Sequence, residues 1–98
     1  MTENKPTIEK QVETIDNTKL SLPFSVILFN DDFHTFDEVI LQLMKATQCS
    51  FKEAEAKTLE AHNKGKAKVY HGELSKCLNV SSILEEIALR TQVVSEDI

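Results

Sequence analysis

The chain has 98 residues, with 16 acidic residues against 11 Lys and Arg, a formal net charge of −5, and 41% hydrophobic residues. A chain of this length buries roughly two-thirds of its unfolded surface on folding, which suffices for one modest core and excludes a two-domain enzyme. The regular apolar spacing, alongside 28% charged residues, argues against disorder throughout. We therefore expect one small folded domain.

The charge and apolar patterns exclude several kinds of partner. The basic residues are scattered along an acidic chain, whereas nucleic-acid binding needs a positive surface, so nucleic acid is not expected. No apolar run approaches the roughly 20 residues that cross a bilayer, and residues 1–22 contain no apolar segment of a secretion signal. The two cysteines, Cys49 and Cys77, are far apart and predict small buried residues instead of a zinc or redox motif. We expect a cytoplasmic protein that does not bind membranes.

Residues 1–22 are polar, with only isolated aliphatic residues before Pro23. Their apolar stripe is too short to hold a helix in water without a partner. The segment predicts a flexible N-terminal tail ahead of a folded domain over residues 23–98, and a tail that engages a partner is the alternative.

The first elements of the domain are a strand and a helix. Residues 24–29 form a compact run rich in β-branched and aromatic residues, which predicts a strand buried on both faces. Thr35 and Glu38 then have the spacing of a capping box, in which each side chain bonds the other residue's backbone. Apolar residues follow at intervals of three and four, so the pattern predicts an amphipathic helix over about 36–47.

A second helix is expected to begin after Ser50, which pairs with Glu53 in another capping box, and to end near Gly65. The apolar face of this helix is expected to carry Phe51, Ala54, Thr58, Ala61 and His62. Residues 66–71 alternate in polarity and predict a short strand or edge segment.

A third amphipathic helix is predicted after Gly72, with residues up to Ala88 on its apolar face. Residues 79–82 favour a break or a restart within it, because Ser82 and Glu85 again have capping-box spacing. Residues 91–94 are β-prone and predict a last strand. The order β-α-α-β-α-β indicates an α+β domain with helices packed on one small sheet.

The polar run of Asn30, Asp31 and Asp32 follows the first strand directly. Such residues are ordinary turn formers, and carboxylates before a helix gain from its dipole, so a loop explains them without a site. No spacing of metal ligands accompanies them, so no metal is expected. His62 likewise has an ordinary explanation as a boundary residue.

An enzyme is the weaker class of function for this sequence. The chain contains no Gly-x-Ser-x-Gly, Ser-x-x-Lys or glycine-rich phosphate loop, and no cysteine has a spacing that suggests a partner histidine. A small hydrolase using Asp31, Asp32 and His62 ranks far below the binding functions, because no activated nucleophile accompanies them. No cofactor is expected.

Several motifs occur in order along residues 24–94, and they are Val26–Asp32 with Phe33, Ala54, Ala61–His62, Gly65–Ala67, Val69–Tyr70 and Glu73. With these motifs the chain resembles the ClpS family, adaptors of the ATP-dependent Clp protease. The resemblance implies a small α+β, non-enzymatic adaptor. It would bind the free amino terminus of proteins with a bulky hydrophobic first residue (N-degrons) and pass them to a ClpA- or ClpC-type ATPase.

The resemblance also implies roles for individual residues. The α-ammonium would be bound by Asn30, Asp31 and His62, with Asp32 as an accessory acidic residue. The first side chain would enter an apolar slot with His34 at its mouth, lined by Phe36, Val39, Thr58, Ala61 and one of Val93 or Val94. The surface that docks on the Clp ATPase would include Glu73, with Lys76 as an approximate substitute for a family lysine.

The sequence departs from the family pattern around the slot. The usual Thr-Pro-Met is here His34-Thr35-Phe36, a common methionine gate is Thr58, and the Val before the histidine is Ala61. These changes predict weaker selectivity among first residues. A diverged module that keeps the fold but binds a different or internal peptide is the alternative function.

Overall fold

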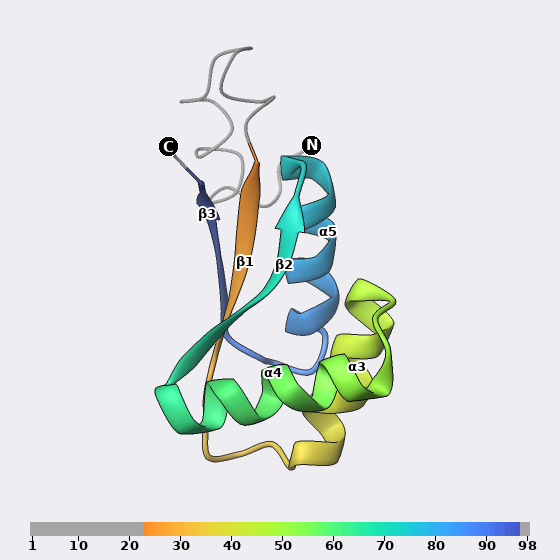
Figure 1. The fold of residues 1–98 in the computed structure, drawn as a ribbon, viewed down its shortest axis with the longest axis vertical. Helices are drawn as coiled ribbons and strands as arrows, with labels where there is room; N and C mark the ends of the chain where they lie inside the picture. The colour runs from red at the N-terminus through yellow and green to blue at the C-terminus, as the bar shows by residue number, and fades with distance from the viewer. Residues whose placement is uncertain (1–22, 97–98) are drawn as a thin grey trace.

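The computed structural model describes residues 23–96, so the predicted tail, residues 1–22, lies outside the described part of the chain. The elements follow in the predicted order (Figure 1). They are β1 (Phe24–Phe29), α3 (Phe36–Thr47), α4 (Phe51–Lys64), β2 (Lys66–Gly72), α5 (Leu74–Glu85) and β3 (Thr91–Ser95). The predicted α+β class and β-α-α-β-α-β order are confirmed.

The three strands form one antiparallel sheet in the order β2-β1-β3, so β1 is the central strand. Val26 and Leu28 of β1 are almost completely buried and belong to the core. Ile27 and Phe29, which point to the opposite side of the strand, are only half-buried. The expectation that β1 is buried on both faces is therefore wrong for these two residues, because the second face is incompletely covered.

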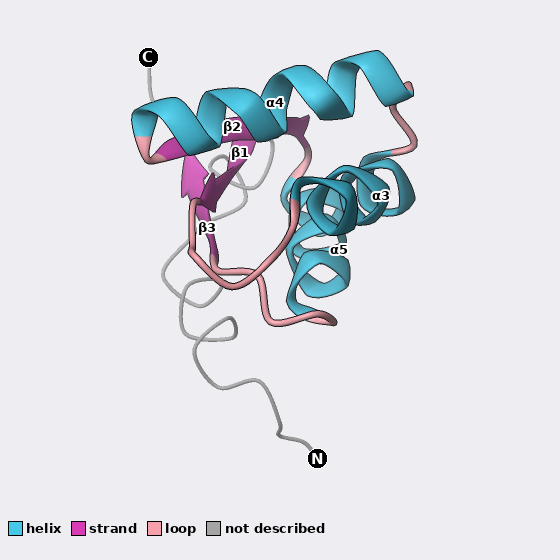
Figure 2. Ribbon diagram, turned by 90° about the horizontal axis from the view of Figure 1, so that it is seen from below, coloured by secondary structure: helices cyan, strands magenta, loops and turns pink. Residues whose placement is uncertain are grey.

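The helices form a layer against the sheet (Figure 2). α5 contacts all three strands, α4 runs beside the edge strand β2, and α3 packs against both α4 and α5. Cys77 of α5 is fully buried in this core, as predicted, whereas Cys49 is half-buried. None of the described helices is long and apolar enough to cross a bilayer.

Both predicted capping boxes are present. The Glu38 backbone N–H donates to Thr35 Oγ1 at 3.1 Å, and the Thr35 N–H donates to Glu38 Oε1 at 2.9 Å. Ser50 begins α4 through the same reciprocal bonds with Glu53. Phe51 is nevertheless 49% exposed, so its predicted place on the buried face of α4 is wrong. It is the first residue of the helix, where the core does not reach it.

The end of α5 differs from the sequence prediction. The helix is continuous across residues 79–82, because Cys77, Val80, Ser81 and Leu84 bury an unbroken face. It ends at Glu85, and the next turn is a Schellman motif, in which the Leu89 N–H donates to the Leu84 carbonyl and the Ala88 N–H to the Glu85 carbonyl. Ala88 has the left-handed φ of 66° that this motif requires and is exposed, so it does not extend the apolar helical face.

Candidate functional site

Three chain segments meet where β1 ends. The backbone N–H of Asn30 donates to the Gly65 carbonyl at 3.0 Å, and the N–H of Phe29 donates to the Arg90 carbonyl at 3.0 Å. Gly65 ends α4 with a φ of 91°, a conformation that glycine adopts without steric cost. These bonds hold the loop after β1 between the end of α4 and the segment that leads into β3.

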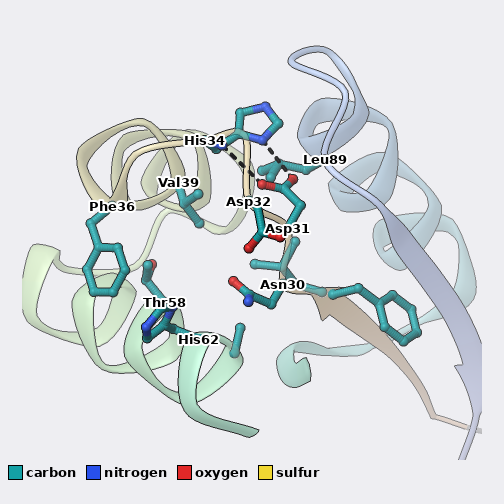
Figure 3. Close-up of a pocket in the computed structure, with 12 residues that line it drawn as sticks. Asn30, Asp31, Asp32, His34, Phe36, Val39, Thr58, His62 and Leu89 are labelled. Carbon is teal, nitrogen blue, oxygen red and sulfur yellow. Dashed lines mark hydrogen bonds and ion pairs between the residues drawn. The ribbon is translucent and has the colours of Figure 1, made fainter. Parts of the chain in front are cut away.

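A cavity of about 250 Å³ opens at this junction (Figure 3). The β1–α3 loop supplies most of its polar groups, and the facing sides of α3 and α4 supply apolar groups and one histidine. The lining residues are Leu28, Phe29, Asn30, Asp31, Asp32, His34, Phe36, Val39, Thr58, Ala61, His62 and Leu89. The fold therefore brings together every residue expected at the ammonium and five of those expected in the slot.

The Asp31 carboxylate is bonded within its own loop. Its Oδ1 accepts from the backbone N–H groups of Phe33 at 2.9 Å and His34 at 3.0 Å, and its Oδ2 lies 2.8 Å from the His34 ring. Burial by itself would raise the pKa of Asp31, but these hydrogen bonds lower it below its ordinary value. Asp31 is therefore an anion whose orientation is set before any ligand arrives.

The His34 ring bridges two segments. Nδ1 faces Asp31 Oδ2, and Nε2 lies 2.5 Å from the backbone carbonyl of Ile87 in the turn after α5. An ionised carboxylate and a carbonyl can only accept hydrogen bonds, so this placement favours a ring that donates from both nitrogens, as an imidazolium does. The Ile87 carbonyl and then the Asp31 carboxylate raise the pKa of His34 above its ordinary value.

His62 has different surroundings. It is exposed in the last turn of α4, so the expectation that it packs on the apolar face of this helix is wrong. Its ring meets the Phe36 ring edge to face, with centroids 5.2 Å apart and an angle of 70°. Within residues 23–96, the ring makes no hydrogen bond. Its nitrogens remain available to a ligand in the cavity.

The apolar wall of the cavity is formed by Val39, Thr58 and Ala61, with Leu89 opposite. Thr58 is 4% exposed, and its hydroxyl donates to the Ala54 carbonyl at 2.8 Å within α4. The hydroxyl is thus already satisfied and adds little polarity to the wall. Phe36 is 41% exposed and closes one side of the cavity beside His62.

Val93 and Val94 lie away from the cavity, contrary to the expected slot. In the antiparallel register Thr91 is opposite Leu28, whereas Val93 and Val94 are opposite Val26 and Ser25, farther from the end of β1. Val93 packs against the core instead. Leu89, just before β3, supplies this side of the cavity and is 3% exposed. Local sequence patterns did not identify it, because its role depends on burial and strand register, which such patterns do not show.

Glu73 and Lys76, expected at the docking surface, are exposed at the start of α5. Gly72 is opposite Phe24, and Lys66 is opposite Phe29, so these residues and the cavity lie at opposite ends of β1. Five steps along a strand span about 17 Å. Among the described residues, no group of three potential metal ligands is found at either place.

Comparison with known proteins identifies the family. The model of the ClpS family, described as the ATP-dependent Clp protease adaptor protein ClpS, matches residues 19–93 of this chain. The chain therefore belongs to the ClpS family, a family of non-catalytic adaptors, as its sequence motifs indicated.

One solved structure and two human proteins are also similar to this chain. ClpS2 of Agrobacterium tumefaciens, in a structure bound to L-phenylalaninamide, has the same fold, with a TM-score of 0.73 and 20% identity over 78% of this chain and 99% of that one. The human E3 ubiquitin-protein ligases UBR2 and UBR1 are each 31% identical, over 80% and 71% of this chain. The match covers only 5% and 4% of their lengths.

Proposed function

We propose that this protein binds the free amino terminus of proteins whose first side chain is bulky and hydrophobic, and delivers them to a ClpA- or ClpC-type ATPase. The observation that carries the proposal is the cavity itself, which oriented acceptors and an apolar wall line together. An amino-terminal residue presents the matching pair, a charged amine and an apolar side chain, on one carbon atom.

The acceptors suit an α-ammonium, which has three donors and a positive charge. Asn30 offers its side-chain carbonyl, and His62 offers a ring nitrogen free of other hydrogen bonds among the described residues. An ionised carboxylate has about four acceptor positions, and the loop uses three of those of Asp31, which leaves one on Oδ2. Asp32 adds negative charge at the same rim.

The first side chain would lie against Val39, Thr58, Ala61 and Leu89. Burying a Leu or Phe side chain contributes roughly 1.5–3 kcal/mol, and a hydrogen bond to a charged group contributes a comparable amount. Neither the amine nor the side chain alone is then sufficient for tight binding. The ligand of the Agrobacterium ClpS2 structure, L-phenylalaninamide, carries both features, which supports this assignment.

Delivery requires a second surface, for which we propose the exposed start of α5 with Glu73 and Lys76. Its place at the far end of β1 allows substrate and ATPase to bind at the same time. Residues 1–22 would be needed for delivery and dispensable for folding and peptide binding. The place of action would be the cytoplasm.

A fluorescence titration tests the binding function directly. Peptides beginning with Leu, Phe, Tyr, Trp, Ile or Val are measured with free and with acetylated amino termini. Acetylation removes the charge and two donors, so affinity should fall more than tenfold, because each unpaired buried polar group costs about 1–3 kcal/mol. Equal affinities would instead favour the alternative function, a module that binds a different or internal peptide.

A further inference from the structure

We infer that His34 is a positioning residue that joins the two walls of the cavity through a hydrogen-bonded cation, and so makes peptide affinity depend on its charge. This inference rests on the proposed function for its binding consequence. The bridge itself, from Asp31 through His34 to Ile87, is a property of the folded protein and can be tested without any ligand.

The geometry links segments that are distant in sequence. Asp31 belongs to the loop after β1, and Ile87 lies 53 residues beyond His34 in the turn after α5. Each segment contributes to the cavity, the first through Asn30 and Asp31 and the second through Leu89. The ring therefore joins the polar wall to one apolar wall, beside the backbone bond from Phe29 to Arg90.

The hydrogen bonds and carboxylates around the ring favour its charged form and outweigh burial, which opposes it. Asp31 in the loop and Glu38 in α3 are the carboxylates that act on it, and the turn after α5 presents the Ile87 carbonyl. The His34 side chain is 13% exposed and that of Asp31 20%, so water screens the pair only in part. When the ring loses its proton, one of its nitrogens can no longer donate, and either Asp31 or the Ile87 carbonyl loses its hydrogen bond to the ring.

The bridge also changes what Asp31 presents to a ligand. His34 balances its charge and holds Oδ2 in place, so Asp31 meets an ammonium as an oriented acceptor and not as a free anion. Figure 3 shows the hydrogen bonds from His34 drawing the Asp31 carboxylate to one side of the cavity. Binding of the amine then requires no reorganisation of this group.

Two substitutions separate the arms of the bridge. In His34→Asn the amide nitrogen takes a position near Nδ1 and can still donate to Asp31, whereas in His34→Gln it reaches toward the position of Nε2 and the Ile87 carbonyl. Each keeps one arm and removes the charge. We expect either variant to weaken binding of a Leu-initial peptide about five- to tenfold at pH 6. His71→Gln, a histidine on β2 outside the cavity, is the matched control and should leave affinity unchanged.

The pH profile distinguishes a charged bridge from a merely structural residue. The ratio of the dissociation constant of His34→Gln to that of the parent should fall toward one between pH 6 and pH 9, as the parent loses its proton. Titration of the peptide amine affects both proteins equally and cancels in the ratio. A ratio that stays constant over this range overturns the inference.

Ring nitrogen shifts in a ¹⁵N NMR spectrum provide the measurement that needs no peptide. We expect both nitrogens of His34 to be protonated at pH 7, and a neutral ring would overturn the bridge. A spectrum with the charged ring in a protein that binds no amino-terminal peptide would leave the bridge standing and remove the proposed function. The two failures are therefore distinguishable.

Discussion

His34 and His62 line the same cavity, yet their rings are held in different ways. His34 is fixed by two acceptors from separate segments, whereas the ring of His62 rests against Phe36 and makes no hydrogen bond within residues 23–96. The first arrangement favours a protonated ring, and the second leaves the ring nitrogens free for a ligand. The neighbours of a histidine, more than its place in a pocket, therefore decide whether it supports the site or binds a ligand.

Replacing His62 should give the largest effect. In His62→Ala we expect affinity for a free Leu-initial peptide to fall more than tenfold, because the ammonium loses an acceptor in a partly buried site. Fluorescence titration measures the change, and His71→Ala is the control. A greater loss in His34→Gln than in His62→Ala would reverse the roles that the comparison assigns.

Replacing Asp31 should weaken peptide binding more than replacing Asp32. We expect Asp31→Ala to weaken binding roughly tenfold and Asp32→Ala only a few-fold, because Asp31 combines an ammonium acceptor with three hydrogen bonds of the loop. Dissociation constants for one peptide on the parent and both variants provide the measurement. The opposite order would assign the ammonium to Asp32.

Thr58 tests the apolar wall of the cavity. The parent should distinguish Leu from Ile and Val weakly, within the roughly 1–3 kcal/mol of a methylene-sized difference. Thr58→Met adds a bulky, flexible side chain to the wall and should increase the preference for Leu several-fold. Dissociation constants for Leu-, Ile-, Val- and Phe-initial peptides, with melting curves to check folding, decide the matter. Strong rejection of Ile and Val by the parent, unchanged in the variant, would exclude Thr58 as the gate.

The pH dependence of stability sharpens the contrast between the histidines. Because the folded pKa of His34 is raised, its contribution is complete below its ordinary value of 6.5 and is lost as the pH rises through the folded value. The lowered pKa of Asp31 makes its contribution complete above 3.8 and lost as the pH falls through the folded value. We expect the parent to exceed His34→Gln in free energy of unfolding by about 1 kcal/mol between these limits and by less at pH 9.

Urea unfolding of both proteins at pH 5.5 and pH 9 measures this difference. His71→Gln again serves as the control, since that ring is more exposed and lies 3.9 Å from Glu96. A gap that widens toward pH 9 would contradict an imidazolium at position 34.

The smallest effect is expected at Ala88, next to the carbonyl that His34 binds. A left-handed conformation costs a non-glycine residue about 1–2 kcal/mol. Glycine removes this strain, but the greater entropy of the unfolded chain with glycine offsets part of the gain. Ala88→Gly should therefore raise the free energy of unfolding by up to about 1 kcal/mol, measured by urea unfolding. A clear loss of stability would mean that the Ala88 methyl group has a contact that outweighs the strain.

Local sequence signals predicted the fold well because they act within a few residues. The capping boxes at Thr35 and Ser50 place the starts of α3 and α4 at the predicted residues. The end of α5 was harder to predict, because its Schellman turn uses Ala88 where glycine is the usual signal. Because Ala88 fits the helical spacing of apolar residues, the sequence pattern does not indicate that the helix has ended before it.

The site was predictable only as far as the family motif reaches. Asn30, Asp31 and His62 carry that motif and meet in the cavity. Leu89 and the bond between His34 and Ile87 depend on packing between segments more than 50 residues apart, which no local pattern encodes. The strand register, which local sequence does not show, likewise places Val93 and Val94 away from the cavity.

The hydrogen bond from the Asn30 backbone to Gly65 has a thermodynamic consequence. It fixes one rim of the cavity to the end of α4, and the bond from Phe29 to Arg90 fixes another rim to the start of β3. A receptor assembled in advance loses little conformational entropy when it is filled, so most of the ordering penalty falls on the ligand. A single amino-acid amide, which has little freedom to lose, should then retain much of the affinity of a long peptide.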